Sequence, residues 1–238
     1  MFNSASIRIY SLLSISIFAP MLKQVISLLH KDFLIEWKHK SGFAGVILYS
    51  MVSIYCCYLV FRQALEPATW NALFWIIMLF AATNAIAKSF MSESRGLQLF
   101  YYSLLNARAV IIAKSIYNIS FLFVITIINL LVYITLLGNV VHDLPMFLCV
   151  ILLGVSALAI VLTLVSAIVA RANNSATLIA ILGFPLLIPL LITIIRCSRN
   201  AIDGLGWAVN QPYIIVLVSL NVLCMGLSYL LFPYLWRD

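Results

Sequence analysis

The sequence predicts an all-α membrane protein, a polytopic bundle of about six transmembrane helices. Of its 238 residues, 65% are hydrophobic and 9% are charged, whereas roughly 25% of the residues of a soluble domain are charged. The charges lie in short breaks between apolar runs long enough to cross a bilayer. Backbone amides in lipid must be paired within one segment or in a closed barrel, and barrel strands would alternate over about 10 residues, so these runs indicate helices.

The expected helices are the runs of apolar residues that are long enough to cross the bilayer. At about 1.5 Å of rise per residue, each run reaches roughly 30 Å, enough for one crossing. The runs are residues 42–65, 69–87, 110–137, 145–170, 176–195 and 213–236. They leave no stretch for a second, soluble domain, so we expect residues 42–238 to form one transmembrane domain.

The segment before the first run predicts an amphipathic helix, residues 21–41, on the cytoplasmic membrane surface. Apolar residues recur there at i, i+3, i+4 spacing, with polar residues between them. The apolar positions are Leu22, Val25, Ile26, Leu29, Phe33 and Trp37. Residues 1–20 are an N-terminal extension or follow a misassigned start, with Met21 as the alternative, because their apolar stretch is too short to span and has no clear cleavage site.

The basic residues predict that both termini are cytoplasmic. With the N-terminus inside, all but three of the 14 Lys and Arg residues lie on the inner side, where basic loops are retained. The exceptions are Arg62, Arg196 and Arg199. The net charge of +7 therefore reflects orientation in the membrane rather than binding of nucleic acid, since no basic patch is interleaved with stacking aromatic residues.

The connection between the second and third runs has about 22 residues, where a hairpin would need only a few. It carries an amphipathic pattern, interrupted by Gly96. Its candidate contact residues are Glu93, Arg95, Gly96, Leu97, Phe100, Tyr101 and Leu104. Two interpretations stay open: a helix that floats at the lipid headgroups, or a docking element for a cytoplasmic partner.

The sequence contains no motif for catalysis, nucleotide binding or metal binding. A P-loop is absent, so any ATP must be hydrolysed by another chain. The five cysteines form no CxxC pair, which argues against a zinc site or a disulfide framework. His142 lies beside Asp143 in a short outer turn, where a solvated histidine is expected rather than a ligand. We therefore expect no enzyme activity, no bound cofactor and no metal.

Polar residues inside the runs predict helix packing. Asn118 and Asn129 are eleven residues apart and so lie at nearly the same azimuth of one helix, where they either form packing hydrogen bonds or line a path. Lys114 lies about one turn inside the third run, and its stem can snorkel to the cytoplasmic surface. This position argues against an ion-coupled carrier, which needs ionisable groups at mid-membrane.

The fifth run carries the sharpest local pattern, I-L-G-F-P-L-L-I-P-L-L-I at residues 181–192. Pro185 and Pro189 each remove a backbone hydrogen bond and kink the helix. The kinks either fit a bent helix to its neighbours or form a hinge in a gate.

These residues resemble the I-L-x-x-P-L-x-I-P-L-L-I motif of the CcmB family, haem exporter protein B of bacterial cytochrome c maturation, an ABC-2-type permease subunit. The resemblance extends from about Met21 onward, with weaker matches at residues 29–38 and at Ala113-Lys114. The long connection departs from the family: residues 95–100 and 103–106 read R-G-L-Q-L-F and S-L-L-N, where members commonly have G-x-L-E and L-x-P.

The resemblance implies an ABC-2-type permease architecture with an N-terminal amphipathic helix, in the bacterial inner membrane. It implies a separate ATPase subunit of the CcmA type, the partners CcmC, CcmD and the haem chaperone CcmE, and a homodimer of permease subunits. Haem would be a substrate of the complex, either carried across the membrane or released with its chaperone. Closure of the ATPase would push residues 93–105 and the entry helix, and the kinked fifth run would relay the movement. The alternatives are an ABC-2-type exporter of another substrate and a non-transporting assembly scaffold.

Overall fold

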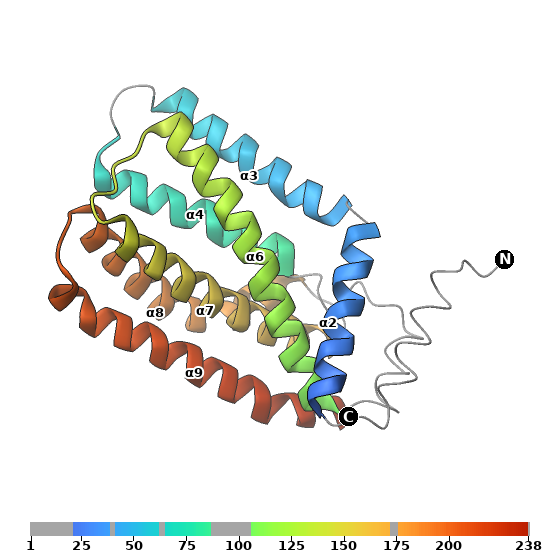
Figure 1. The fold of residues 1–238 in the computed structure, drawn as a ribbon. Helices are drawn as coiled ribbons and strands as arrows, with labels where there is room; N and C mark the ends of the chain where they lie inside the picture. The colour runs from blue at the N-terminus through green and yellow to red at the C-terminus, as the bar shows by residue number, and fades with distance from the viewer. Residues whose placement is uncertain (1–20, 39–40, 62–64, 87–105, 172–175, 238) are drawn as a thin grey trace.

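The computed structural model describes residues 21–38, 41–61, 65–86, 106–171 and 176–237, and over these residues the chain is a bundle of α-helices without strands (Figure 1). The helices are α2 (Met21–Lys38), α3 (Ser41–Val60), α4 (Pro67–Ile86), α6 (Ala107–Leu137), α7 (Leu144–Arg171), α8 (Ala176–Ile202) and α9 (Trp207–Arg237). Six of them, α3 to α9, are long and apolar enough to cross a membrane. The predicted fold class, an all-α polytopic membrane bundle, is confirmed.

Three predicted helix boundaries are wrong at the end of the bundle away from α2. Helix α3 ends at Val60 rather than at residue 65. Helix α8 does not end at residue 195 but continues to Ile202, and α9 begins at Trp207 rather than at residue 213. The last turns of α8 are amphipathic, because Cys197 and Ser198 are buried while Arg196 is exposed. Hydropathy alone stops at the first arginine, whereas burial of one face lets the helix continue.

The final turn of α8 also accounts for one of the basic residues on the predicted outer side. Arg199 Nε lies 3.6 Å from Asp203 Oδ2, an exposed i,i+4 pair. Such an exposed pair contributes little to stability, and Arg199 remains one of the three basic residues on the predicted outer side.

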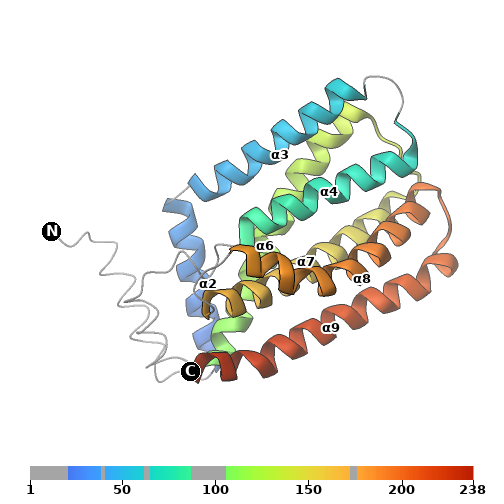
Figure 2. The same cartoon turned by 180° about the vertical axis from the view of Figure 1, so that it is seen from behind.

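Helix α7 is the central helix of the bundle and packs against α4, α6, α8 and α9 (Figures 1 and 2). Its buried residues include Val150, Val155, Leu158, Val161, Leu162, Val165 and Val169. Gly154 permits a close approach, because a Cβ atom there would lie 3.0 Å from Cη2 of Trp75 and 3.1 Å from Cδ1 of Ile194. By contrast, α3 and α9 expose apolar side chains along much of their length, as expected of helices that face lipid.

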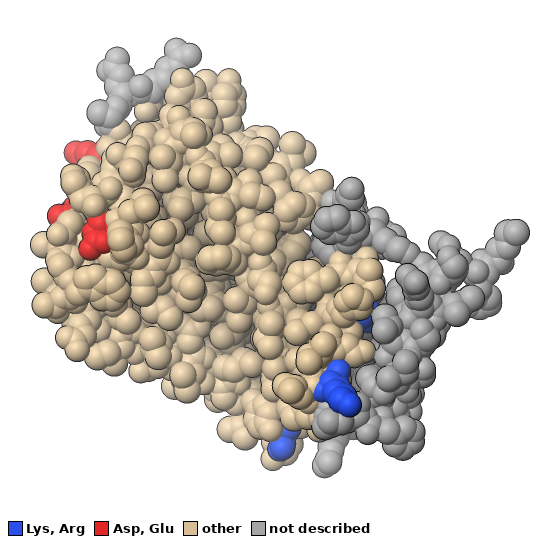
Figure 3. Space-filling view, in the orientation of Figure 1, with Lys and Arg blue, Asp and Glu red and all other residues tan. Residues whose placement is uncertain are grey.

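On the face of the molecule drawn in Figure 3, acidic side chains lie at the end away from α2 and basic side chains lie at the α2 end. Arg196 and Arg199 near the end of α8, and the buried Asp32 of α2, depart from this pattern. Glu66, Asp143 and Asp203 adjoin the ends of α4, α7 and α8. Lys23 and Arg108 belong to α2 and to the start of α6. The asymmetry has the sense expected if the α2 end is cytoplasmic, which stays a prediction.

Candidate functional site: the bundle end around α2

Helix α2 lies across one end of the bundle, where the start of α6 meets the ends of α7 and α9 (Figures 1 and 2). Val25 and Leu28 are its buried apolar residues. They join a cluster with Ala107, Ala109, Val110, Ile111, Ala113, Ala167 and Phe232. Helix α2 thus packs on α6, and its buried apolar residues belong to one cluster that also includes residues of α7 and α9.

Only part of the apolar stripe predicted for α2 is buried in the structure. Val25 is buried and Leu29 is partly buried, but Leu22, Ile26 and Phe33 are 72%, 58% and 49% exposed. The side chain of Trp37 lies outside the described part of the chain.

The face of α2 that turns inward instead combines apolar and polar residues. It carries Gln24, Val25, Leu28, Lys31 and Asp32, all buried. Positions i, i+1, i+4, i+7 and i+8 share one helical face. The exposed apolar face is therefore left for lipid or for a partner, and the charges point into the protein.

Asp32 is the centre of a buried ion cluster. One carboxylate oxygen, Oδ1, lies 2.9 Å from Lys31 Nζ, and the other, Oδ2, lies 3.5 Å from Lys114 Nζ on α6. The three side chains are 2%, 8% and 9% exposed for Lys31, Asp32 and Lys114. Lys114 does not snorkel to the surface as expected, because the carboxylate from α2 lies within reach of its ammonium group. Pairing offsets part of the cost of removing these charges from water.

Two further contacts hold the start of α6. The backbone N–H of Asn106 donates to Gln24 Oε1 at 3.5 Å, and Asn106 Oδ1 accepts from the backbone N–H of Arg108 at 3.0 Å as the N-cap of the helix. The Arg108 guanidinium lies 4.9 Å from the ring centroid of Tyr229 on α9. The start of α6, where the long connection rejoins the bundle, therefore contacts both α2 and α9.

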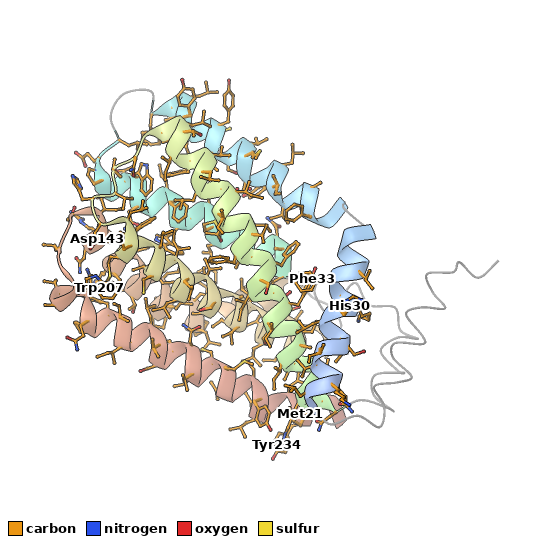
Figure 4. The ribbon with its side chains drawn as sticks, in the orientation of Figure 1. Met21, His30, Phe33, Asp143, Trp207 and Tyr234 are labelled. Carbon is orange, nitrogen blue, oxygen red and sulfur yellow. The ribbon has the colours of Figure 1, made fainter. Side chains whose placement is uncertain are left out.

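An aromatic ladder continues the site toward the membrane interior. Phe33 of α2 contacts Tyr117 of α6 edge-on, with ring centroids 5.3 Å apart, and Tyr117 stacks on Phe121 at 5.8 Å. Phe121 in turn contacts Phe43 of α3 at 5.7 Å. Figure 4 shows Phe33 beside α6, whereas His30 points away from it. The ladder links α2 to two membrane spans.

The predicted docking residues of the long connection lie outside the described residues. They are Glu93, Arg95, Gly96, Leu97, Phe100, Tyr101 and Leu104. Their role stays a prediction, and the described site consists of the surfaces on which the connection ends.

Asn118 and Asn129 are both buried, and each amide has its partner on a different helix. Asn118 Nδ2 donates to Thr163 Oγ1 of α7 at 2.8 Å. Asn129 Oδ1 accepts from Ser50 Oγ of α3 at 2.8 Å. This geometry favours packing hydrogen bonds over a shared polar path, because the two amides point to different helix interfaces.

The same kind of amide contact recurs at interfaces that the sequence analysis did not single out. Asn71 of α4 donates to the carbonyl of Ile195 at 2.8 Å and accepts from Ser198 Oγ at 2.8 Å. Asn221 of α9 donates to the carbonyl of Leu153 at 3.0 Å and accepts from Ser156 Oγ at 2.8 Å. The sequence signal for these contacts is an asparagine inside a long apolar run, because its amide needs a hydrogen-bond partner in lipid.

Pro185 and Pro189 are exposed on the outer face of α8. Phe184, Ile188 and Ile192 share that face and are 62%, 50% and 49% exposed. The opposite face, with Leu190, is buried against the core. The predicted hinge therefore faces away from the central helix, and its role stays a prediction.

His142 is exposed at the other end of the bundle, and one of its ring nitrogens is engaged. Nδ1 lies 2.6 Å from the carbonyl oxygen of Ile202. A carbonyl only accepts, so Nδ1 carries the hydrogen. The backbone N–H of Asp143 also donates to the carbonyl of Ala201 at 3.0 Å. These bonds tie the turn between α6 and α7 to the end of α8. Among the described residues, no three His, Cys, Asp or Glu side chains gather as a metal site.

A protein-family model described as CcmB protein matches residues 23–233. The match includes nearly all of α2 and most of α9, and therefore every membrane span at least in large part. No curated protein matches the chain.

Proposed function

The chain belongs to the CcmB family, the permease component of the haem exporter in the ABC system of cytochrome c maturation, and we propose that it converts ATP hydrolysis by a separate subunit into delivery of haem or release of a haem-loaded chaperone. The ATPase would be of the CcmA type, and this chain would itself be non-catalytic. The complex would reside in the bacterial inner membrane, with both termini of the chain in the cytoplasm.

The observation that carries the coupling role is the packing of α2 on α6, which itself packs against α7 and α9. Val25 and Leu28 share one apolar cluster with residues of α6, α7 and α9. A displacement of α2 would therefore act on several spans at once, because packed side chains move together. An interfacial helix that only floated at the headgroups would need no such contacts.

The proposed ATPase surface combines the long connection with the exposed face of α2. Leu22 and Ile26 are apolar and exposed, and Asn106, where the described chain resumes after the connection, bonds to Gln24. A partner groove that accepts the connection would thus lie beside α2. We further propose CcmC, CcmD and CcmE as partners and a homodimer of this chain, for which the apolar outer faces of α3 and α9 offer surface.

The packing of the outer half of the bundle favours chaperone release, or a haem path between subunits, over passage through a single chain. Trp70, Phe74, Tyr133 and Phe147 pack together there, with ring centroids between 4.8 and 6.1 Å apart. All four are buried among helices α4, α6 and α7. A haem ring would have to displace them.

Copurification tests the proposed function. Replacing Leu97 together with Phe100 or Tyr101 by Asp should cost several kcal/mol of association with the ATPase, because a helix in a groove depends on its apolar anchors. Leu205→Asp is the matched control, an exposed leucine at the opposite end of the bundle. At equal membrane abundance, we expect the loop variants to lose both the ATPase and cytochrome c, and the control to keep both. Undiminished copurification of the loop variants would show that the connection is a lipid-surface helix.

A further inference from the structure

We propose that Asp32 is a positioning residue that locks α2 to α6 in one register, so that the surface helix and the third membrane span move as one body. The consequence for transport rests on the proposed function, whereas the lock itself does not. The proposal assigns a role to a buried charge that the membrane environment would otherwise disfavour.

The contacts between the two helices advance in step along both. Gln24 meets Asn106 and, eight residues further on each helix, Asp32 meets Lys114. The next contact joins Phe33 to Tyr117. A nearly constant offset means that α2 runs in the same direction as the first half of α6 and beside it. Asp32 stands between the polar contact at one end and the aromatic contact at the other.

The apolar part of this interface depends less on register than the ion pair does. Val25 and Leu28 lie in one cluster with Ala107, Ala109, Val110, Ile111 and Ala113 of α6. Apolar contacts are non-directional, so their free energy follows the buried area rather than the position of any one pair of groups. An ion pair is different, because its energy depends on the positions of two particular groups.

The geometry at Asp32 suits such a lock. Its two carboxylate oxygens reach a lysine of its own helix and a lysine of α6, at 2.9 and 3.5 Å. The carboxylate therefore joins the charge of α2 to that of α6 within a site that is shielded from water, where screening by salt is weak. Sliding by one turn would separate Asp32 from Lys114.

The lock is tested first without any partner, by hydrogen exchange of the full chain in lipid nanodiscs. We expect Asp32→Asn to speed exchange of the α2 amides by about tenfold or more, because the helix opens locally when its anchor is lost. Lys23→Gln removes a charge from the exposed side of the same helix and should leave exchange unchanged. Lys114→Met removes the α6 partner of Asp32 and should speed exchange to a similar extent, and the double variant should add little to either single change, because both remove the same pairing. Unchanged exchange in Asp32→Asn would overturn the proposal.

If Asp32→Asn does not accumulate, Lys114→Met decides, because it removes the α6 partner and leaves Asp32 beside Lys31. Exchange of the α2 amides about tenfold faster in Lys114→Met would support pairing between the two helices. Unchanged exchange in Lys114→Met would overturn it.

The transmission of movement from α2 to α6 is tested in the complex with the ATPase. We expect Asp32→Asn to retain the ATPase within about twofold, yet to lower the cytochrome c yield per ATP hydrolysed by about tenfold, with a similar loss in Lys114→Met. An unchanged yield per ATP would refute transmission through Asp32. If the wild-type chain itself retains no ATPase, the proposed function fails, while the exchange measurement still decides the lock.

Discussion

At the end of the bundle away from α2, sequence-distant turns are joined by packed rings and by hydrogen bonds to backbone carbonyls, whereas at the other end α2 contacts α6 through the side chains of its own inward face. The indole N–H of Trp70 donates to the carbonyl of Gly138 at 3.1 Å, and Tyr133 OH donates to the carbonyl of Trp70 at 2.9 Å. At the α2 end, Asp32 and Lys114 join their helices through side-chain tips.

The difference separates a rigid end from an end that can respond. Contacts that include the backbone of several turns resist local opening, so the end with Trp70 should stay intact until the bundle unfolds. A helix attached through one face can be displaced without unfolding its neighbours. The ATPase proposed above would act on that second end.

The membrane topology gives the largest expected effect. The comparison requires the two ends of the bundle to lie on opposite sides of the membrane. A reporter fused after Asp238 should be cytoplasmic, and a reporter inserted at His142 should be on the other side. Reporters of opposite specificity, such as a phosphatase and a fluorescent protein, check both assignments. The same side for both positions would contradict the arrangement of six spans.

Trp70→Ala should have the largest effect on stability. The side chain is fully buried, and its loss leaves a cavity and removes the bond to the carbonyl of Gly138, at a cost of about 3–5 kcal/mol. Trp207→Ala is the control, because Trp207 is 55% exposed near the same end (Figure 4). Unfolding of the detergent-solubilised protein followed by heat should show a large loss for the first variant only. Equal stability of the two would mean that the rings do not hold this end together.

Leu28→Ala should act locally at the other end. Leu28 is 3% exposed, and truncation of a buried leucine costs about 2–5 kcal/mol. Because α2 is attached through one face, we expect faster hydrogen exchange in α2 while the melting transition of the six spans stays unchanged. Ile26→Ala, at a position that is 58% exposed on the same helix, is the control. A melting transition lowered as much as in Trp70→Ala would mean that α2 is an integral part of the bundle.

Much of the fold could be predicted because, in lipid, each segment must pair its own backbone hydrogen-bonding groups. A run of about 20 apolar residues must form a helix to pair its own backbone, whatever its neighbours are. This requirement is weakest at the ends of the runs, where water competes with protein contacts. There the prediction ended α8 at residue 195, although Cys197 and Ser198 are buried and extend the helix to Ile202.

The sequence by itself determined the number of spans, the helical entry segment and the presence of amides that need partners. Tertiary structure alone decided which face of α2 turns inward, because that helix has apolar residues on more than one side and the face with Asp32 meets Lys114. It likewise decided that Asn118 bonds to α7 and Asn129 to α3. The physical reason is the same in each case: a hydrogen bond or an ion pair is satisfied by a group from a distant part of the chain, whereas helix formation in lipid is satisfied within the segment itself.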